Sequence, residues 1–358
     1  MLNPRKAVLE MREYHPPLAG RTGLRLDFNE NTEGCSSRVL ERIRQITAED
    51  LARYPEREPV EAFVASRLEL AAEQLLLTNG VDEAIHLLCE TYLDAADEAV
   101  IVTPTFGMYE VLAEATGARV VRVQCEEDFC FPLYEILRAI TERTRLIAIA
   151  SPNNPTGTAA TREQILRICD QAPDAAVLVD EAYYEFHGYT VLGDISNRPN
   201  LFVARTFSKA YGLAGLRAGV LAGDVGQMKA VRRVSSPYNV NAVALLAVPT
   251  ALEDSEHVAA YVAQVKRGRD RVCEALERFG IRYWRSQANF VLFYVGEQHR
   301  AFVSAMRQRG ILVRDRSADP GCDGCVRVTI GTHAQMDEAL PAMVQVLTEL
   351  GLSKAVTG

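Results

Sequence analysis

The residue with the strongest chemical signal is Lys209, which lies in the run Thr-Phe-Ser-Lys-Ala-Tyr-Gly and follows an apolar stretch that predicts a buried strand. Burial lowers the pKa of a lysine, because the charged form loses its hydration. A neutral amine can form a Schiff base with an aldehyde. The neighbouring Thr206, Ser208 and Arg217 are suited to hold a phosphate through hydroxyl and guanidinium hydrogen bonds. This stretch therefore predicts a reactive lysine beside an anion.

Two further polar side chains follow apolar runs that predict strands. Asp180 comes directly after residues 176–179, where a carboxylate is costly unless it meets a cation such as a protonated pyridine. Asn154 lies in a loop with two prolines, Ser-Pro-Asn-Asn-Pro-Thr-Gly, which can present its amide to a phenolic oxygen. Alone, Asp180 also fits a helix cap or surface acid, and Asn154 also fits a plain turn.

Two weaker features precede these. Gly80, Val81 and Asp82 open a predicted helix, whose positive end favours an anion, although Asp82 also fits as an acid that complements the helix dipole. Phe106 and Tyr109 follow a Pro-Thr pair and suit either a planar ring or the core. The order of all these groups, each after a strand of one sheet, indicates a site for a phosphorylated pyridine aldehyde, pyridoxal phosphate.

The elements that position these groups alternate along the chain. Continuous apolar strands separated by helices predict a mostly parallel sheet covered on both faces, with ligands beyond the carboxyl ends of the strands. Residues 1–45 are expected to form a polar arm, and the helix expected at 255–279 is long enough to bridge two domains. We expect strands at 99–102, 119–123, 146–150, 176–179, 201–204, 219–222, 289–295, 311–314 and 326–330, and helices at 60–73, 81–93, 240–252, 255–279, 297–309 and 334–350.

The bulk composition is that of a folded protein without a large basic surface. The 358 residues are 48% hydrophobic and carry a net charge of −8, which argues against nucleic acid or anionic membranes as main partners. The chain starts without a signal-peptide pattern and has no apolar run long enough to span a membrane, so a cytoplasmic location is expected. Cys322 and Cys325 form a lone C-x-x-C; an ordinary loop is expected, with a redox pair or a metal as alternatives, and no metal site is predicted.

Three motifs together carry a resemblance to a known family. Residues 151–157, 180–183 and 206–217 resemble the fold-type I, class I/II aminotransferases over essentially the whole chain. Further stretches resemble the histidinol-phosphate aminotransferase branch of that family: 26–31, 53–55, 104–109, 288–290, 313–315 and 326–332. The resemblance implies an α/β fold, in which a large pyridoxal-phosphate domain of three layers holds a mostly parallel, seven-stranded sheet and a smaller α+β domain completes the chain. The implied boundaries are 46–260 for the large domain and 1–45 with 261–358 for the arm and small domain.

The resemblance also implies roles by position. Lys209 would bind the cofactor aldehyde and shuttle a proton between the substrate Cα and cofactor C4′, Asp180 would hold the ring nitrogen protonated, and Tyr183 and Asn154 would bind the ring oxygen. The remaining cofactor contacts implied are ring stacking by Phe106 and phosphate binding by Gly80, Val81, Asp82, Thr206, Ser208 and Arg217.

On the substrate side, Arg327 would clamp a carboxylate, with Arg314, Tyr14 and Asn154 as further candidates, and Tyr54 would reach the site of a partner subunit in a homodimer. The sequence departs from the branch at the stacking position, where a tyrosine is frequent, and at the phosphate turn, where Asn-Gly-Val-Asp replaces the frequent Gly-Ser-Asp. The segment 14–21 matches only loosely, which leaves the amino donor open.

The expected activity is a ping-pong transamination from L-histidinol phosphate to 2-oxoglutarate. An aromatic amino-acid aminotransferase shares nearly all of these residues. A decarboxylase such as threonine-phosphate decarboxylase would use the same cofactor site but release CO₂. A non-catalytic sensor built on this fold would need an added DNA-binding segment, for which the chain has neither the length nor the basic charge.

Overall fold

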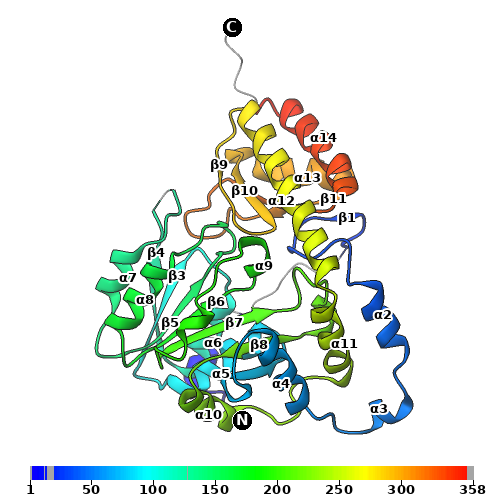
Figure 1. The fold of residues 1–358 in the computed structure, drawn as a ribbon. Coiled ribbons are helices and arrows are strands. Elements are labelled where there is room, and N and C mark those ends of the chain that lie inside the picture. The colour runs from blue at the N-terminus through cyan, green and yellow to red at the C-terminus, as the bar shows by residue number, and fades with distance from the viewer. Residues whose placement is uncertain (1, 12, 14–19, 127, 353–358) are drawn as a thin grey trace.

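The computed structural model describes residues 2–11, 13, 20–126 and 128–352. They form a large body around a seven-stranded sheet and a smaller body around a four-stranded sheet (Figure 1). The sheets share no strand, and a two-stranded pair, β1–β11, lies apart from both.

The large sheet has the strand order β2-β8-β7-β6-β5-β3-β4. Strand β8 runs antiparallel to both of its neighbours, and every other pairing in the sheet is parallel. The bounds are β2 Leu75–Thr78, β3 Glu98–Thr103, β4 Arg119–Gln124, β5 Thr144–Ala150, β6 Ala176–Asp180, β7 Leu201–Thr206 and β8 Gly219–Ala222. The predicted fold, an α/β protein with a mostly parallel seven-stranded sheet, is confirmed.

Helices cover both faces of this sheet because its central strands are apolar on both sides. Along β3, Ala99 and Ile101 pack in the cluster that includes α5 and α6, whereas Val100 and Val102 pack in the cluster that includes α7 and α8. The helices of this body are α4 Glu58–Arg67, α5 Val81–Tyr92, α6 Met108–Thr116, α7 Leu133–Ala139, α8 Arg162–Gln171, α9 Tyr184–His187, α10 Val225–Val234 and α11 Ala242–Glu253, with 3₁₀ turns η1 Ala72–Gln74, η2 Leu192–Asp194 and η3 Ala214–Leu216. Because strands β3 to β7 are parallel to one another, their carboxyl ends meet at one edge of the sheet, and the site lies there.

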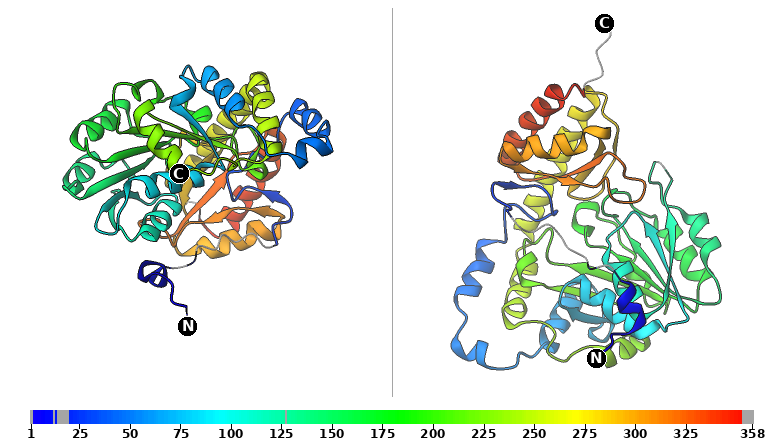
Figure 2. Two further views of the ribbon diagram at one scale, coloured as in Figure 1. Left: turned by 90° about the horizontal axis from the view of Figure 1, so that it is seen from below. Right: turned by 180° about the vertical axis from the view of Figure 1, so that it is seen from behind.

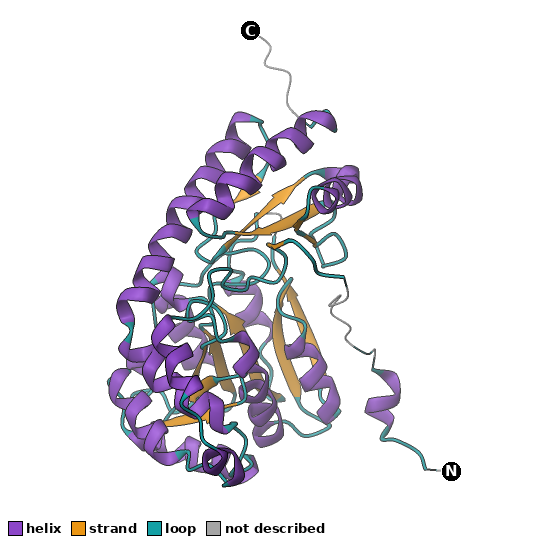
Figure 3. Ribbon diagram, turned by 90° about the vertical axis from the view of Figure 1, so that its right-hand side faces the viewer, coloured by secondary structure: helices purple, strands orange, loops and turns teal. Residues whose placement is uncertain are grey.

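The small body packs three helices on an antiparallel sheet of order β12-β13-β10-β9. Helix α12 extends from the large body to the small one, as Figures 1 and 3 show from two sides. The bounds are α12 Ser255–Arg278, β9 Tyr283–Trp284, β10 Phe290–Tyr294, η4 Gly296–Gln298, α13 His299–Gln308, β11 Ile311–Leu312, β12 Arg314–Asp315, β13 Cys325–Thr329 and α14 His333–Glu349. Helix α12 is therefore the bridging helix that the sequence predicted.

The N-terminal segment lies beside both bodies. Its elements are α1 Lys6–Glu10, β1 Leu24–Arg25, α2 Ser37–Arg44 and α3 Ala48–Ala52. Strand β1 pairs in parallel with β11 beside the small body, whereas α2 contacts α11 of the large body (Figure 2). The predicted boundaries, 46–260 for the large domain and 1–45 with 261–358 for the arm and small domain, stay a proposal. Helix α2 belongs to the 1–45 part but packs against α11 of the 46–260 part.

The expected elements match the observed ones within a few residues, with two exceptions. The helix expected at 60–73 ends at Arg67, and the strand β2 that follows it was not predicted. Its Leu75-Leu76-Leu77 run carries no β-branched residue, so propensity favours a helix. The run is a strand because it pairs with β8 along its length and its side chains alternate between two core clusters. The strand expected at 311–314 is divided at Val313 between β11 and β12. No helix in the described ranges is long and apolar enough to cross a membrane.

Candidate active site

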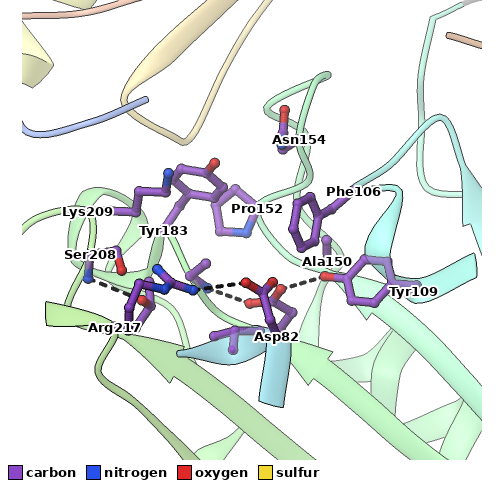
Figure 4. Close-up of a pocket in the computed structure, with 14 residues that line it drawn as sticks. Asp82, Phe106, Tyr109, Ala150, Pro152, Asn154, Tyr183, Ser208, Lys209 and Arg217 are labelled. Carbon is purple, nitrogen blue, oxygen red and sulfur yellow. Dashed lines mark hydrogen bonds and ion pairs between the residues drawn. The ribbon is translucent and has the colours of Figure 1, made fainter. Parts of the chain in front are cut away.

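Two adjoining cavities lie at the carboxyl edge of the large sheet. The inner cavity, of about 150 Å³, is the one drawn in Figure 4. It is lined by Val81, Asp82, Phe106, Tyr109, Ala150, Pro152, Asn154, Asp180, Ala182, Tyr183, Thr206, Ser208, Lys209 and Arg217. The outer cavity, of about 380 Å³, shares Phe106, Asn154, Tyr183 and Lys209 with it. The structure thus brings together most of the predicted cofactor residues from six separate segments.

One end of the inner cavity is built to receive an anion. Arg217 Nη2 lies 2.9 Å from Asp82 Oδ2, and both side chains are partly exposed to the cavity. Gly80, at φ +78°, allows this approach, since a Cβ on it would lie 2.6 Å from Arg217 Nη2. The buried Ser208 Oγ has no hydrogen-bond partner within the described ranges, while the Ser208 N–H donates to Thr206 Oγ1 at 3.1 Å. An unsatisfied hydroxyl beside a guanidinium fits a phosphate.

Asp180 also lines the inner cavity and has a short hydrogen bond to a tyrosine. Tyr109 Oη donates to Asp180 Oδ2 at 2.5 Å, and Ala182 N–H donates to Asp180 Oδ1 at 3.0 Å. Burial raises the pKa of Asp180 to about 6, although these two hydrogen bonds lower it. A cation placed against this carboxylate would lower its pKa again, so the environment favours a cationic partner.

Lys209 occupies the junction between the two cavities. Its Nζ donates to the Phe28 carbonyl oxygen at 3.1 Å. Burial, together with the nearby Arg327, lowers the pKa of Lys209 to about 8. The amine is therefore far easier to deprotonate than an exposed lysine, as the sequence predicted for a Schiff-base residue.

Tyr183 and Asn154 line both cavities together with Lys209, and each is hydrogen-bonded to a side chain from another segment. Asn29 Nδ2 donates to Tyr183 Oη at 2.9 Å, and Arg327 Nη1 donates to Asn154 Oδ1. Figure 4 shows Phe106 on the far side of the cavity from Lys209. This arrangement leaves space for a flat ring between an aromatic face and a reactive amine.

The outer cavity is rich in arginine. Arg327, Arg314, Arg316 and Arg122 line it, together with Glu110 and Asp319. Arg327 is almost fully buried, and its Nη2 donates to the Asp27 carbonyl oxygen at 2.5 Å. Burial and the neighbouring Arg316 and Arg314 lower the pKa of Arg327 to about 9. Mutual repulsion of this kind is relieved when an anion binds among the cations.

Two predicted site residues lie elsewhere. Tyr54 is 76% exposed and stacks on Tyr238 with ring centroids 4.3 Å apart, on a face that is not part of either cavity. Tyr14 lies outside the described residues. The roles assigned to all the site residues stay predictions.

Sequence reasoning missed three groups that contact the site. It placed Tyr109 near a ring but not on Asp180, and the only available signal was the spacing of Tyr109 three residues after Phe106. It gave no role to Asn29, within the 26–31 motif, or to Arg316, two residues after Arg314. Cys322 and Cys325, which follow Arg316 in the chain, are buried free thiols.

Comparison with known proteins places the chain in a family. Residues 21–343 match the family model "Aminotransferase class I and II". The chain therefore belongs to the class I and II aminotransferases, as the motifs predicted.

Individual relatives narrow this further. The chain is 32% identical to a histidinol-phosphate aminotransferase of Moorella thermoacetica, over 96% of this chain and 92% of the relative, and 34% identical to one of Roseiflexus castenholzii, over 97% and 98%. The predicted similarity to the histidinol-phosphate branch is confirmed. Among solved structures, the histidinol-phosphate aminotransferase of Sinorhizobium meliloti in complex with pyridoxal-5′-phosphate has a TM-score of 0.88 at 23% identity, covering 98% of this chain and 99% of the other, which shows the shared fold.

Proposed function

We propose that this protein is a pyridoxal 5′-phosphate-dependent aminotransferase that transfers the amino group of L-histidinol phosphate to 2-oxoglutarate in two ping-pong half-reactions. Family membership establishes the aminotransferase class. The names of the relatives at 32% and 34% identity support the donor. The choice of 2-oxoglutarate as acceptor rests on the resemblance alone.

The residues of the inner cavity fit the cofactor. Arg217 and the unpartnered Ser208 hydroxyl would hold its phosphate, next to the Gly80 turn that a Cβ would obstruct. Asp180 would pair with its ring nitrogen, and Tyr183 with its ring oxygen, as predicted for those residues. When bound, pyridoxal phosphate supplies an electron sink for the charge left at the substrate Cα.

The protein's own contribution is proton transfer and orientation. We assign Lys209 as the general base that takes the Cα proton of the substrate and the general acid that returns a proton to the reacting group. Its pKa of about 8 suits both roles near neutral pH, because neither protonation state is strongly disfavoured. Asn154 and Arg327, which are hydrogen-bonded to each other, would orient the substrate's anionic group.

The single observation that supports an anionic substrate is the hydrogen bonding of the buried Arg327 side chain. Among the described residues, its guanidinium donates only to two neutral oxygens, the side-chain amide oxygen of Asn154 and the backbone carbonyl oxygen of Asp27. Its buried Nε has no hydrogen-bond partner there. A buried guanidinium without a carboxylate partner is costly unless the substrate supplies the anion. A phosphate or a carboxylate meets this requirement, and a neutral donor does not.

A donor screen tests this proposal. The purified protein, loaded with the cofactor, is mixed in single-turnover experiments with L-histidinol phosphate, with phenylalanine and with threonine phosphate, and the loss of the aldehyde absorbance is followed. We expect the fastest conversion to the amine form with L-histidinol phosphate. Faster conversion with phenylalanine would instead favour an aromatic aminotransferase, and CO₂ release without conversion to the amine form would favour a decarboxylase.

We also propose that the protein is a cytoplasmic homodimer in which Tyr54 completes the partner's site. The exposure of Tyr54 and Tyr238 supports a covered face there, and eight free cysteines suit a reducing compartment. Co-expression of Lys209→Ala and Tyr54→Ala chains tests the shared site, since a mixed dimer would contain one intact pair. Restored activity relative to either variant alone is expected, and its absence in a verified mixed dimer would contradict the shared site.

A further inference from the structure

Three consecutive residues of the 26–31 motif each contact a different group of the site. The Asp27 carbonyl oxygen accepts from Arg327 Nη2 at 2.5 Å, and the Phe28 carbonyl oxygen accepts from Lys209 Nζ at 3.1 Å. The Asn29 side chain donates to Tyr183 Oη at 2.9 Å. A segment that precedes the large sheet in the chain therefore touches groups from both bodies.

The backbone geometry of Asn29 supports a specific purpose. Its φ of +56° lies in the left-handed region, which non-glycine residues rarely adopt and which asparagine tolerates better than most. Asn29 is almost fully buried, and the Asn289 side chain donates to its carbonyl oxygen at 3.1 Å. An unfavourable conformation at a buried position beside a site is a sign of functional constraint.

The hydrogen bonds around Asn29 determine which way its amide points. The Asn29 N–H donates to Thr329 Oγ1 at 3.0 Å, and the Thr329 hydroxyl in turn donates to Asn29 Oδ1 at 3.1 Å. The NH₂ group is then left to face Tyr183. In the reverse orientation, Thr329 would meet two donors and its own hydrogen would have no acceptor in this group, so the amide direction follows from the network.

We propose that Asn29 is a positioning residue that orients the phenol of Tyr183. Because Tyr183 Oη accepts the Asn29 N–H, its own hydrogen must point away from Asn29, toward an acceptor in the cavity. That acceptor is the ring oxygen of the cofactor, so this inference rests on the proposed function. Asn29 thereby makes Tyr183 a donor at the ring oxygen and stabilises negative charge there.

The test measures how the absorbance of the bound cofactor changes with pH. A donor at the ring oxygen stabilises the deprotonated form of the bound cofactor and lowers the midpoint of that change. In Asn29→Asp the new carboxylate accepts the phenol hydrogen instead, so the midpoint should rise by about one pH unit. Tyr183→Phe should raise it as well, since it removes the same donor.

The controls separate orientation from added charge. Asn31→Asp adds a carboxylate two residues away, on a side chain that contacts Ala210 and not Tyr183, so it reports the effect of charge alone. In the Tyr183→Phe background, the Asn29→Asp shift should fall to the size of the Asn31→Asp shift. An Asn29→Asp midpoint equal to that of Asn31→Asp, or a full shift that persists without the phenol hydroxyl, would overturn the proposal.

A second variant, Asn29→Gly, keeps the proposal testable if Asn29→Asp fails to fold. Asn29→Gly keeps the positive φ without strain and removes the amide, so it should fold and raise the midpoint by less than Asn29→Asp, again only when Tyr183 is present. No Tyr183-dependent shift in this variant would also overturn the proposal. If the parent protein gains no absorbance band when the cofactor is added, the proposed function itself fails, which is a distinct result.

Discussion

The two cavities of the site are built in different ways. The inner cavity takes its walls mainly from the ends of successive strands and the loops after them, and it contains an ion pair between Arg217 and Asp82. The outer cavity is assembled from segments near residues 28, 105, 154 and 316, and its most buried cation, Arg327, has only neutral hydrogen-bond partners. The inner cavity is thus preorganised for a resident group, whereas the outer one awaits an anion.

This difference explains why the residues themselves predict most of the inner cavity, whereas Arg327 and Arg314 of the outer cavity were implied only by the resemblance. Asp180 and Lys209 each follow a run whose apolar character predicts a strand, so local sequence also specifies their position, whereas Val81 and Asp82 follow β2, which was not predicted. The contact between Asn29 and Tyr183 joins residues 154 positions apart, and that between Arg327 and Asp27 joins residues 300 positions apart. No local pattern encodes such a pairing, because it depends on how the small body sits on the large one.

The largest expected effect comes from the inner cavity. Lys209→Ala removes the only side-chain amine that lines either cavity in the described structure. Turnover should fall below detection, since loss of a general acid–base group alone costs about 10²–10⁴-fold and the covalent link to the cofactor is lost as well. Lys229→Ala, at an exposed position, is the matched control. Multiple turnovers by Lys209→Ala in a steady-state assay would refute the assignment.

The outer cavity should respond in substrate binding more than in cofactor binding. Arg327→Lys keeps the charge but cannot donate to both Asn154 and Asp27 in the same planar geometry. We expect kcat/KM to fall by about 10–100-fold, as for loss of a charge-assisted hydrogen bond, with little change in cofactor affinity. Arg138→Lys, at an exposed position, is the control. An equal loss of cofactor affinity would remove the distinction between the two cavities.

The pH dependence of cofactor binding tests the role of Lys209, which lies at the junction of the two cavities. Because its pKa is lowered to about 8, the amine is mostly protonated below pH 8 and mostly neutral above it. The neutral form is the nucleophile, so the rate at which cofactor-free protein captures pyridoxal phosphate should rise about tenfold per pH unit below 8 and level off above it. Stopped-flow absorbance measures this rate, and a midpoint near 10 would show an unperturbed lysine.

The smallest effect is expected where the inner cavity supports its own carboxylate. Tyr109→Phe removes the 2.5 Å hydrogen bond to Asp180 Oδ2 but leaves the one from Ala182 N–H. Since the lost bond lowers the pKa of Asp180, that pKa should rise above about 6, and less of the carboxylate remains ionised to hold a protonated ring nitrogen. Cofactor affinity should weaken about threefold to tenfold, which corresponds to one hydrogen bond, and more so at pH 6 than at pH 8. Tyr92→Phe removes a comparable hydroxyl, bonded to Gln227 outside the site, and should leave affinity unchanged. A loss in Tyr109→Phe that does not vary with pH would mean that the tyrosine acts through packing and not through the charge of Asp180.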